Sequence, residues 1–212
     1  MIRAYRETYL NKAQSLLGEA FDYAVNSCHV PGEDFISYFV CGPFSKRMEN
    51  GEAAVLSGMS GIELARAIIT TSTGREIDIT PEENFARSSD YWIGWAVAFY
   101  QWWSGRTFGS IFKALGYHDL HRMYYTLHEA DISKFIEIAD AKVKEYYPET
   151  NLKYIRSAFG CSQAELSEMS GVGLRSIQMY EQRNKDINKA SAGTVRSLAK
   201  ALGCKMEDLL EN

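Results

Sequence analysis

Residues 162–181 read SQAELSEMSGVGLRSIQMYE, and this stretch decides the fold of the C-terminal part of the chain. Ser162 followed three residues later by Glu165 forms a capping box, which is typical of a helix start. Gly171 can take the left-handed conformation that ends a helix. The stretch therefore predicts one short helix, a tight turn and a second short helix.

The second helix has an apolar face and an outward face. Leu174, Ile177 and Tyr180 recur at helical spacing and are expected to point inward. The side chains that this arrangement leaves outside are Arg175, Gln178, Met179 and Gln182.

The flanking residues extend the same pattern. Helical periodicity begins before the stretch, at Leu152, and a polar loop follows it over residues 184–190. Ser191 can cap a further helix that Gly203 ends, and a last half-buried turn follows. Residues 151–212 are therefore predicted to form a bundle of five short helices.

Several spaced elements of this segment agree with one family. They are Ser162-Gln163-x-x-Leu166, Ser170-Gly171-Val172, Ile177 with Tyr180-Glu181, Leu198-Ala199-Lys200-Ala201-Leu202-Gly203 and Asp208-Leu209-Leu210. The segment 151–212 resembles the phage-repressor-like (XRE-type) helix-turn-helix family. The resemblance implies a DNA-binding domain and double-stranded DNA as partner.

In that family the second helix lies in the major groove and the first helix braces against the backbone. The resemblance implies that the base-reading positions are Leu174, Arg175, Gln178 and Met179. It implies that the DNA backbone is contacted by Gln163, Gln182, Arg183 and Lys185.

Two features depart from the family pattern. Gly173 stands where a Ser or Thr usually caps the second helix, at a cost of only a few tenths of a kcal/mol. Leu174 and Met179 are apolar at positions that are often polar. An alternative is therefore a helix-turn-helix that has lost DNA binding and serves as a dimerisation bundle.

Charge favours nucleic-acid binding only mildly. Residues 151–212 hold nine Lys and Arg against seven acidic residues, a net charge of +2, whereas residues 1–150 carry −6. Tight operator binding is therefore expected to need two copies of the module.

Composition limits the class of protein. At 212 residues and 46% hydrophobic content, the chain has room for one larger domain besides this module. No apolar run reaches the ~18 residues of a membrane span. The four cysteines are scattered without a CxxC pair, which favours reduced thiols in the cytoplasm and no zinc site.

Residues 1–148 are predicted to be a second helical domain, which makes the chain all-α. Pro148 is expected to end its last helix, and a brief extended piece is possible at residues 76–79. The helices are expected at residues 5–28, 33–39, 44–48, from 60 onward, and at 89–103, 104–115, 119–125 and 131–147.

The helix at residues 89–103 is apolar on all sides, which is typical of a buried helix. A dimer interface and an aromatic ligand pocket are the alternatives. Glu49-Asn50-Gly51, the stretch 57–64 and Tyr91-Trp92-Ile93-Gly94-Trp95 resemble a type of helical domain that accompanies XRE-type readers.

Residues 1–148 carry few signs of chemistry. His118, His121 and His128 lie near Asp119, Glu129 and Asp131, but their spacing fits no specific metal motif. No phosphate loop, nucleophile elbow or catalytic Cys/His spacing occurs. We therefore predict no catalytic residues, no metal and no cofactor, and a protein that is not an enzyme.

These patterns together predict a cytoplasmic DNA-binding transcriptional regulator, a repressor acting as a homodimer. The first domain would dimerise, bind a small-molecule effector or bind another protein. The alternative is an antitoxin whose first domain neutralises a toxin while the second represses its operon. An enzyme domain fused to a DNA reader is a third possibility, which would need convergent polar residues in a cleft.

Overall fold

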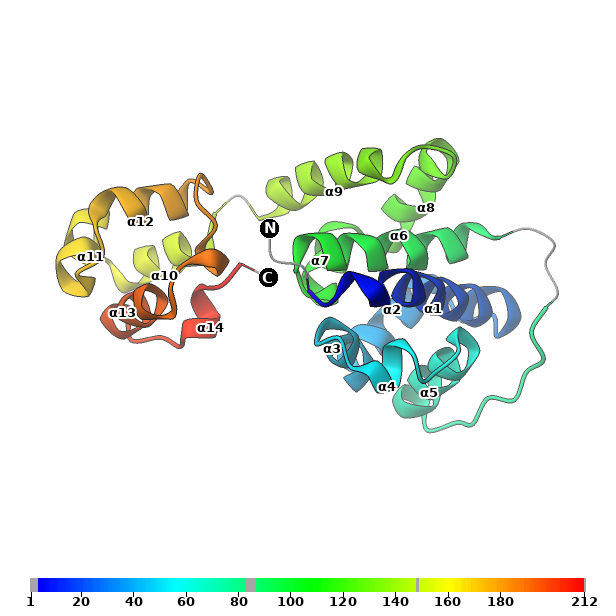
Figure 1. The fold of residues 1–212 in the computed structure, drawn as a ribbon. Helices are drawn as coiled ribbons and strands as arrows, with labels where there is room; N and C mark the ends of the chain where they lie inside the picture. Colours follow the sequence, from blue (N-terminus) through cyan, green and yellow to red (C-terminus); the bar gives the residue numbers. More distant parts are fainter. Residues whose placement is uncertain (1–3, 83–86, 148, 212) are drawn as a thin grey trace. The chain divides into compact units, whose positions relative to one another are not determined.

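The computed structural model describes residues 4–82, 87–147 and 149–211. These residues form helices joined by turns and loops, with no strand among them, so the predicted all-α class is confirmed. The chain divides into two compact units, Met1–Tyr146 and Tyr147–Asn212 (Figure 1). Pro148, expected to end the last helix of the first unit, lies outside the described residues, and α9 ends at Tyr146.

The first unit is a helical bundle in which most connections are short, except the one over residues 74–88 between α5 and α6. In chain order they are η1 (Glu7–Tyr9), α1 (Leu10–Asp22), η2 (Tyr23–Ser27), α2 (Gly32–Cys41), α3 (Pro43–Glu49), α4 (Ala53–Leu56), α5 (Gly61–Thr73), α6 (Ser89–Ser104), α7 (Phe108–Ala114), α8 (Tyr117–Leu127) and α9 (Ile132–Tyr146).

Helices α1 and α6 lie side by side at the centre of this unit (Figure 1). α6 buries residues on most of its circumference, including Ile93, Val97 and Tyr100, as expected for a helix that is apolar on all sides. Gly94 permits the close approach, because a Cβ at this position would lie 2.3 Å from the carbonyl oxygen of Leu17 on α1. The two backbones therefore touch where a side chain would hold them apart.

Three local predictions in this unit need correction. The single helix expected at residues 5–28 begins with the 3-10 turn η1 and ends with the π-helical turn η2. The extended piece at 76–79 is not a strand, because it has no strand to pair with among the described residues. The short helix α4 was not predicted, although it buries Val55 and Leu56.

The second unit contains the predicted five short helices and one 3-10 turn. They are α10 (Asn151–Phe159), α11 (Gln163–Ser170), α12 (Leu174–Glu181), η3 (Ile187–Lys189), α13 (Ala192–Leu202) and α14 (Met206–Leu209). The segment expected to be a polar loop contains η3, whose Ile187 is buried in the core. That core consists of Leu152, Leu166, Ile177, Tyr180, Ile187, Val195, Leu198, Ala199, Leu202 and Leu209.

The contact at Gly94 can be tested by substitution. Gly94→Ala is expected to lower the free energy of unfolding by about 1–3 kcal/mol or more, because the new methyl group meets backbone that cannot move aside. Chemical denaturation of the full chain measures this change. Gly109→Ala on α7 is the control, since its Cβ would meet only the Val40 Cγ1 atom, at 3.3 Å. Equal losses for the two variants would contradict the proposed role of the α1–α6 contact.

Candidate nucleic-acid interface

The turn between α11 and α12 is held by side-chain hydrogen bonds to the backbone. Gly171 ends α11 with φ of 69°, in the left-handed region that favours glycine. The Ser167 hydroxyl donates to the carbonyl oxygen of Val172 at 2.7 Å, and the Val172 N–H donates to the Ser170 Oγ at 3.2 Å. Val172 is half-buried against the core of the unit. Two side chains of α11 therefore hold both backbone groups of Val172, which fixes the start of the turn.

The start of α11 has the predicted capping box. The Ser162 N–H donates to Glu165 Oε2 at 2.7 Å, and the Glu165 N–H donates to Ser162 Oγ at 3.2 Å. The bond from the Ser162 backbone lowers the pKa of the Glu165 carboxyl below its ordinary value. The box holds the first turn of α11 in place.

The outward face of α12 carries the side chains that the family resemblance assigns to base reading. Arg175 is exposed, and Gln178 and Met179 are half-buried. Leu174 is 39% exposed, which corrects the expectation that it packs inward with Ile177. Arg175, Gln178 and Met179 lie on the side away from the buried Ile177, Tyr180 and Glu181, and Leu174 lies at the edge of that side in the first turn. Their contact with bases remains a prediction.

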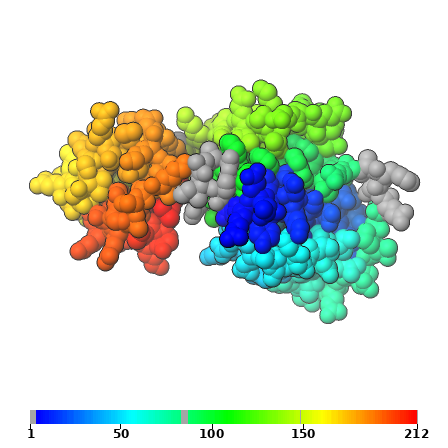
Figure 2. Space-filling model, in the orientation of Figure 1, coloured from blue at the N-terminus to red at the C-terminus, as the bar shows by residue number. Residues whose placement is uncertain are grey.

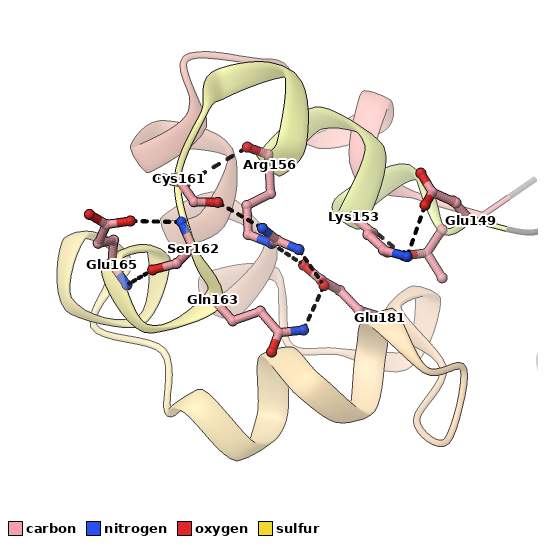
Figure 3. Close-up of polar contacts among 9 residues, drawn as sticks. Glu149, Lys153, Arg156, Cys161, Ser162, Gln163, Glu165 and Glu181 are labelled. Atoms are coloured by element: carbon pink, nitrogen blue, oxygen red, sulfur yellow. Dashed lines mark hydrogen bonds and ion pairs between the residues drawn. The ribbon is translucent and has the colours of Figure 1, made fainter.

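The orientation of α12 depends on an ion pair inside the unit (Figure 3). Arg156 on α10 donates from Nε to Glu181 Oε1 at 2.6 Å and from Nη2 to Glu181 Oε2 at 2.9 Å. The Glu181 side chain is only 2% exposed. These hydrogen bonds raise the pKa of the Arg156 guanidinium above its ordinary value. The third guanidinium nitrogen, Nη1, donates to the carbonyl oxygen of Cys161 at 2.7 Å.

Gln163 joins this network from α11. Its Nε2 donates to Glu181 Oε2 at 2.7 Å, so one carboxylate links α10, α11 and α12 (Figure 3). Gln163 itself is half-buried. It is predicted to contact the DNA backbone, and the bond to Glu181 holds its amide in one orientation. The sequence marks Glu181 only as part of the Tyr180-Glu181 motif and does not predict its burial. No sequence pattern identifies Arg156 as its partner.

Gln182 and Lys185 follow α12 and are both exposed. Gln182 Oε1 accepts a hydrogen bond from Asn184 at 3.0 Å. The Lys185 ammonium lies 5.2 Å from the centre of the Tyr180 ring, and its backbone N–H donates to the carbonyl oxygen of Met179 at 3.0 Å. Lys185 therefore presents a positive charge next to the end of α12, where phosphate contact is predicted.

Arg183 lies in a different environment from the other predicted backbone contacts. Its φ is 55°, a left-handed conformation that is uncommon outside glycine. Its guanidinium donates from Nε to Glu211 Oε2 at 3.0 Å and from Nη2 to the carbonyl oxygen of Glu149 at 3.0 Å. Glu211 also accepts from the Asn151 N–H at 2.8 Å, at the start of α10. Arg183 thus ties both ends of the unit together, and a phosphate contact by it stays a prediction.

The three histidines of the first unit that lie near acidic residues in the sequence, His118, His121 and His128, contact separate partners. His118 Nε2 lies 2.8 Å from Glu33, His121 lies 3.2 Å from the Ser89 hydroxyl, and His128 lies 2.8 Å from the carbonyl oxygen of Tyr124. Within residues 4–82, 87–147 and 149–211, no group of three His, Cys, Asp or Glu residues is placed to hold a metal ion. No helix described by the structure is long and apolar enough to cross a membrane.

The buried ion pair leads to a prediction about stability. Arg156→Met should destabilise the second unit by about 3–5 kcal/mol, because it leaves the Glu181 carboxylate buried without its counter-charge. The double variant Arg156→Met/Glu181→Leu should recover most of this loss. Hydrogen exchange of the amides in α10–α12 during denaturation of the full chain measures both.

The matched control is Lys153→Met, since Lys153 forms a 2.8 Å pair with Glu149 in which the side chains are 42% and 47% exposed. Its loss should cost less than about 1 kcal/mol. If the double variant were as unstable as Arg156→Met, a buried unpaired charge could not be the cause.

Comparison with known proteins agrees with this geometry. Residues 152–209 match the family model described as helix-turn-helix. No curated protein matches the chain, and no solved structure matches it. The segment 152–209 is therefore a helix-turn-helix of the XRE type, the kind found in DNA-binding regulators.

Proposed function

We propose that this protein is a transcriptional repressor that binds a two-fold symmetric operator in the cytoplasm as a homodimer. The observation that carries the proposal is the outward face of α12. Leu174, Arg175, Gln178 and Met179 gather on that face. The helix is held from behind by Ile177, Tyr180 and the buried Glu181 carboxylate.

The chemistry of this face suits the major groove. Arg175 can grip the O6 and N7 atoms of guanine with two hydrogen bonds, and Gln178 can pair with adenine. Leu174 and Met179 can contact the methyl group of thymine. The face therefore offers both polar and apolar contacts to base edges.

One module reads few base pairs and carries a net charge of only +2. Readers of this type gain affinity by placing two recognition helices one turn of DNA apart, about 34–36 Å. Repression requires only that the dimer occupies its operator, whereas activation requires an additional contact with the transcription machinery.

Mapping the sites occupied by the protein on its own genome tests the proposal directly. We expect a small set of sites sharing a two-fold symmetric sequence, with higher transcription of the adjacent genes when the protein is absent. A site confined to its own promoter, beside a small toxin-like reading frame, would favour the antitoxin alternative. Absence of any enriched site would contradict DNA reading.

Arg175→Ala should weaken binding to the mapped operator by about 1–3 kcal/mol and relax the preference at one base pair. A panel of operators with single base-pair changes, titrated against both proteins, measures this. Circular dichroism confirms that the variant is folded, since Arg175 is exposed and makes no core contact. Equal loss on every operator would instead identify Arg175 as a phosphate contact.

Lys185→Ala should weaken binding by a similar factor on all DNA sequences and reduce the salt slope by about one unit per module. Titrations at several salt concentrations measure the slope. An unchanged slope would remove Lys185 from the phosphate contacts. Arg183→Ala is a less direct test, because it also removes the ion pair with Glu211.

A further inference from the structure

Helix α9 has one buried face and one face that the first unit leaves open. Phe135, Ala139 and Val143 are buried at a spacing of four residues. The opposite face exposes Lys134, Glu137, Ile138, Ala141 and Glu145, and Ile138 is 38% exposed. In Figure 2 the yellow-green atoms of α8 and α9 form part of the visible surface of the first unit.

The open face is part of a groove. The end of α8, with Thr126 and Leu127, and Ala130 in the turn that follows it form the other wall of this groove, whose volume is about 540 Å³. Lys142 closes one side of the helix by pairing with Asp119 of α8 at 3.4 Å. The groove is mostly apolar at its centre and charged at its ends, which suits another amphipathic helix.

The side chains along this face are arranged symmetrically: a basic residue stands at one end, an acidic residue at the other, and two apolar residues lie between them. Residues 134, 138, 141 and 145 are Lys, Ile, Ala and Glu, at intervals of four, three and four residues. These are the intervals at which two helices pack along a shared seam. An antiparallel second copy would place Lys134 level with the partner's Glu145, and Ile138 level with the partner's Ala141.

We infer that this face of α9, together with the α8–α9 groove, is where a second copy of the chain binds. An isologous two-fold interface needs one surface that is complementary to itself, and the order basic, apolar, apolar, acidic meets that requirement. Glu137 and Lys144 are also exposed, and antiparallel pairing brings Glu137 near the partner's Lys144. The inference rests on the homodimer of the proposed function, and it specifies the surface through which that homodimer forms.

The charged groups at the ends of the seam are free to form these contacts. Glu145 makes no hydrogen bond or ion pair within the described residues. Lys134 pairs only with Glu137 on its own helix, at 3.6 Å, where both side chains are largely exposed. Such exposed ion pairs contribute little to the stability of the fold, so Lys134 can leave Glu137 and pair with another chain instead.

The seam also lies close in sequence to the DNA-reading module. α9 ends at Tyr146 and α10 begins at Asn151, so a short connection joins them. At about 1.5 Å per residue, the two α9 C-termini would lie about 20 Å apart along the paired helices. Pairing through α9 thus holds the attachment points of the two modules at a fixed separation.

The test is a charge exchange in the full chain, followed by sedimentation velocity across a range of concentrations. Lys134→Glu and Glu145→Lys should each weaken dimerisation at least about tenfold, since two-fold symmetry creates two like-charge contacts per dimer. The double variant Lys134→Glu/Glu145→Lys should restore the dimer, because each reversed charge would then meet its opposite on the partner helix. The matched controls Lys113→Glu and Glu76→Lys change the same charges at exposed positions elsewhere in the unit and should leave dimerisation unchanged.

The possible outcomes distinguish a failure of the α9 surface from a failure of the proposed function. A wild-type dimer that none of the α9 variants weakens, or that the double variant fails to restore, overturns the α9 surface while leaving the proposed function intact. A monomeric wild-type chain at micromolar concentration overturns the homodimer itself. If a charge reversal lowers the helix content, the milder variants Ile138→Ala and Glu145→Gln replace it in the test. Unchanged dimerisation in both of them would contradict the α9 surface.

Discussion

The helix-turn-helix unit depends on one buried carboxylate. Glu181 accepts two hydrogen bonds from Arg156 and one from Gln163, which joins three of the five helices at a single side chain. Removing either charge would strand the other in an apolar core, where an unpaired ion is strongly unfavourable. The apolar residues bring the helices together, but they tolerate small rotations. The paired charges act only in one geometry, so they select the direction in which α12 presents its outer face.

The parts of this unit that follow from local rules could be predicted from the sequence. Ser162 with Glu165 starts α11, Gly171 ends it and Gly203 ends α13, because capping needs only neighbouring residues. The helix α6 is apolar on all sides, and this likewise predicted its burial at the centre of the first unit. The ends of these helices and the position of the turn therefore follow from neighbouring residues, whereas the packing of the helices against one another does not.

The remaining features depend on residues far apart in the chain. Arg183 and Glu211 are 28 residues apart, and no periodicity connects them. Leu174 counted as a core residue by spacing, yet it lies in the first turn of α12, beyond the reach of the core that buries Ile177. The brief extended piece considered at residues 76–79 has no partner strand among the described residues, and a strand needs such a partner from elsewhere in the chain.

The distribution of charge in the second unit supports the proposed homodimer. Two of the cations in the second unit, Arg156 and Arg183, are paired with acids of the same unit and help to hold it together. A module with a net charge of +2 therefore presents even less free positive charge to phosphates than its composition indicates. Such a module can be rigid and selective while binding weakly, because its cations stabilise its own fold. Pairing two modules at a fixed separation raises affinity without adding charge, since the second module binds at a high effective concentration once the first is in place. In the proposed homodimer, a rigid α12 would supply selectivity, and pairing through the preceding domain would supply the affinity that the small net charge does not.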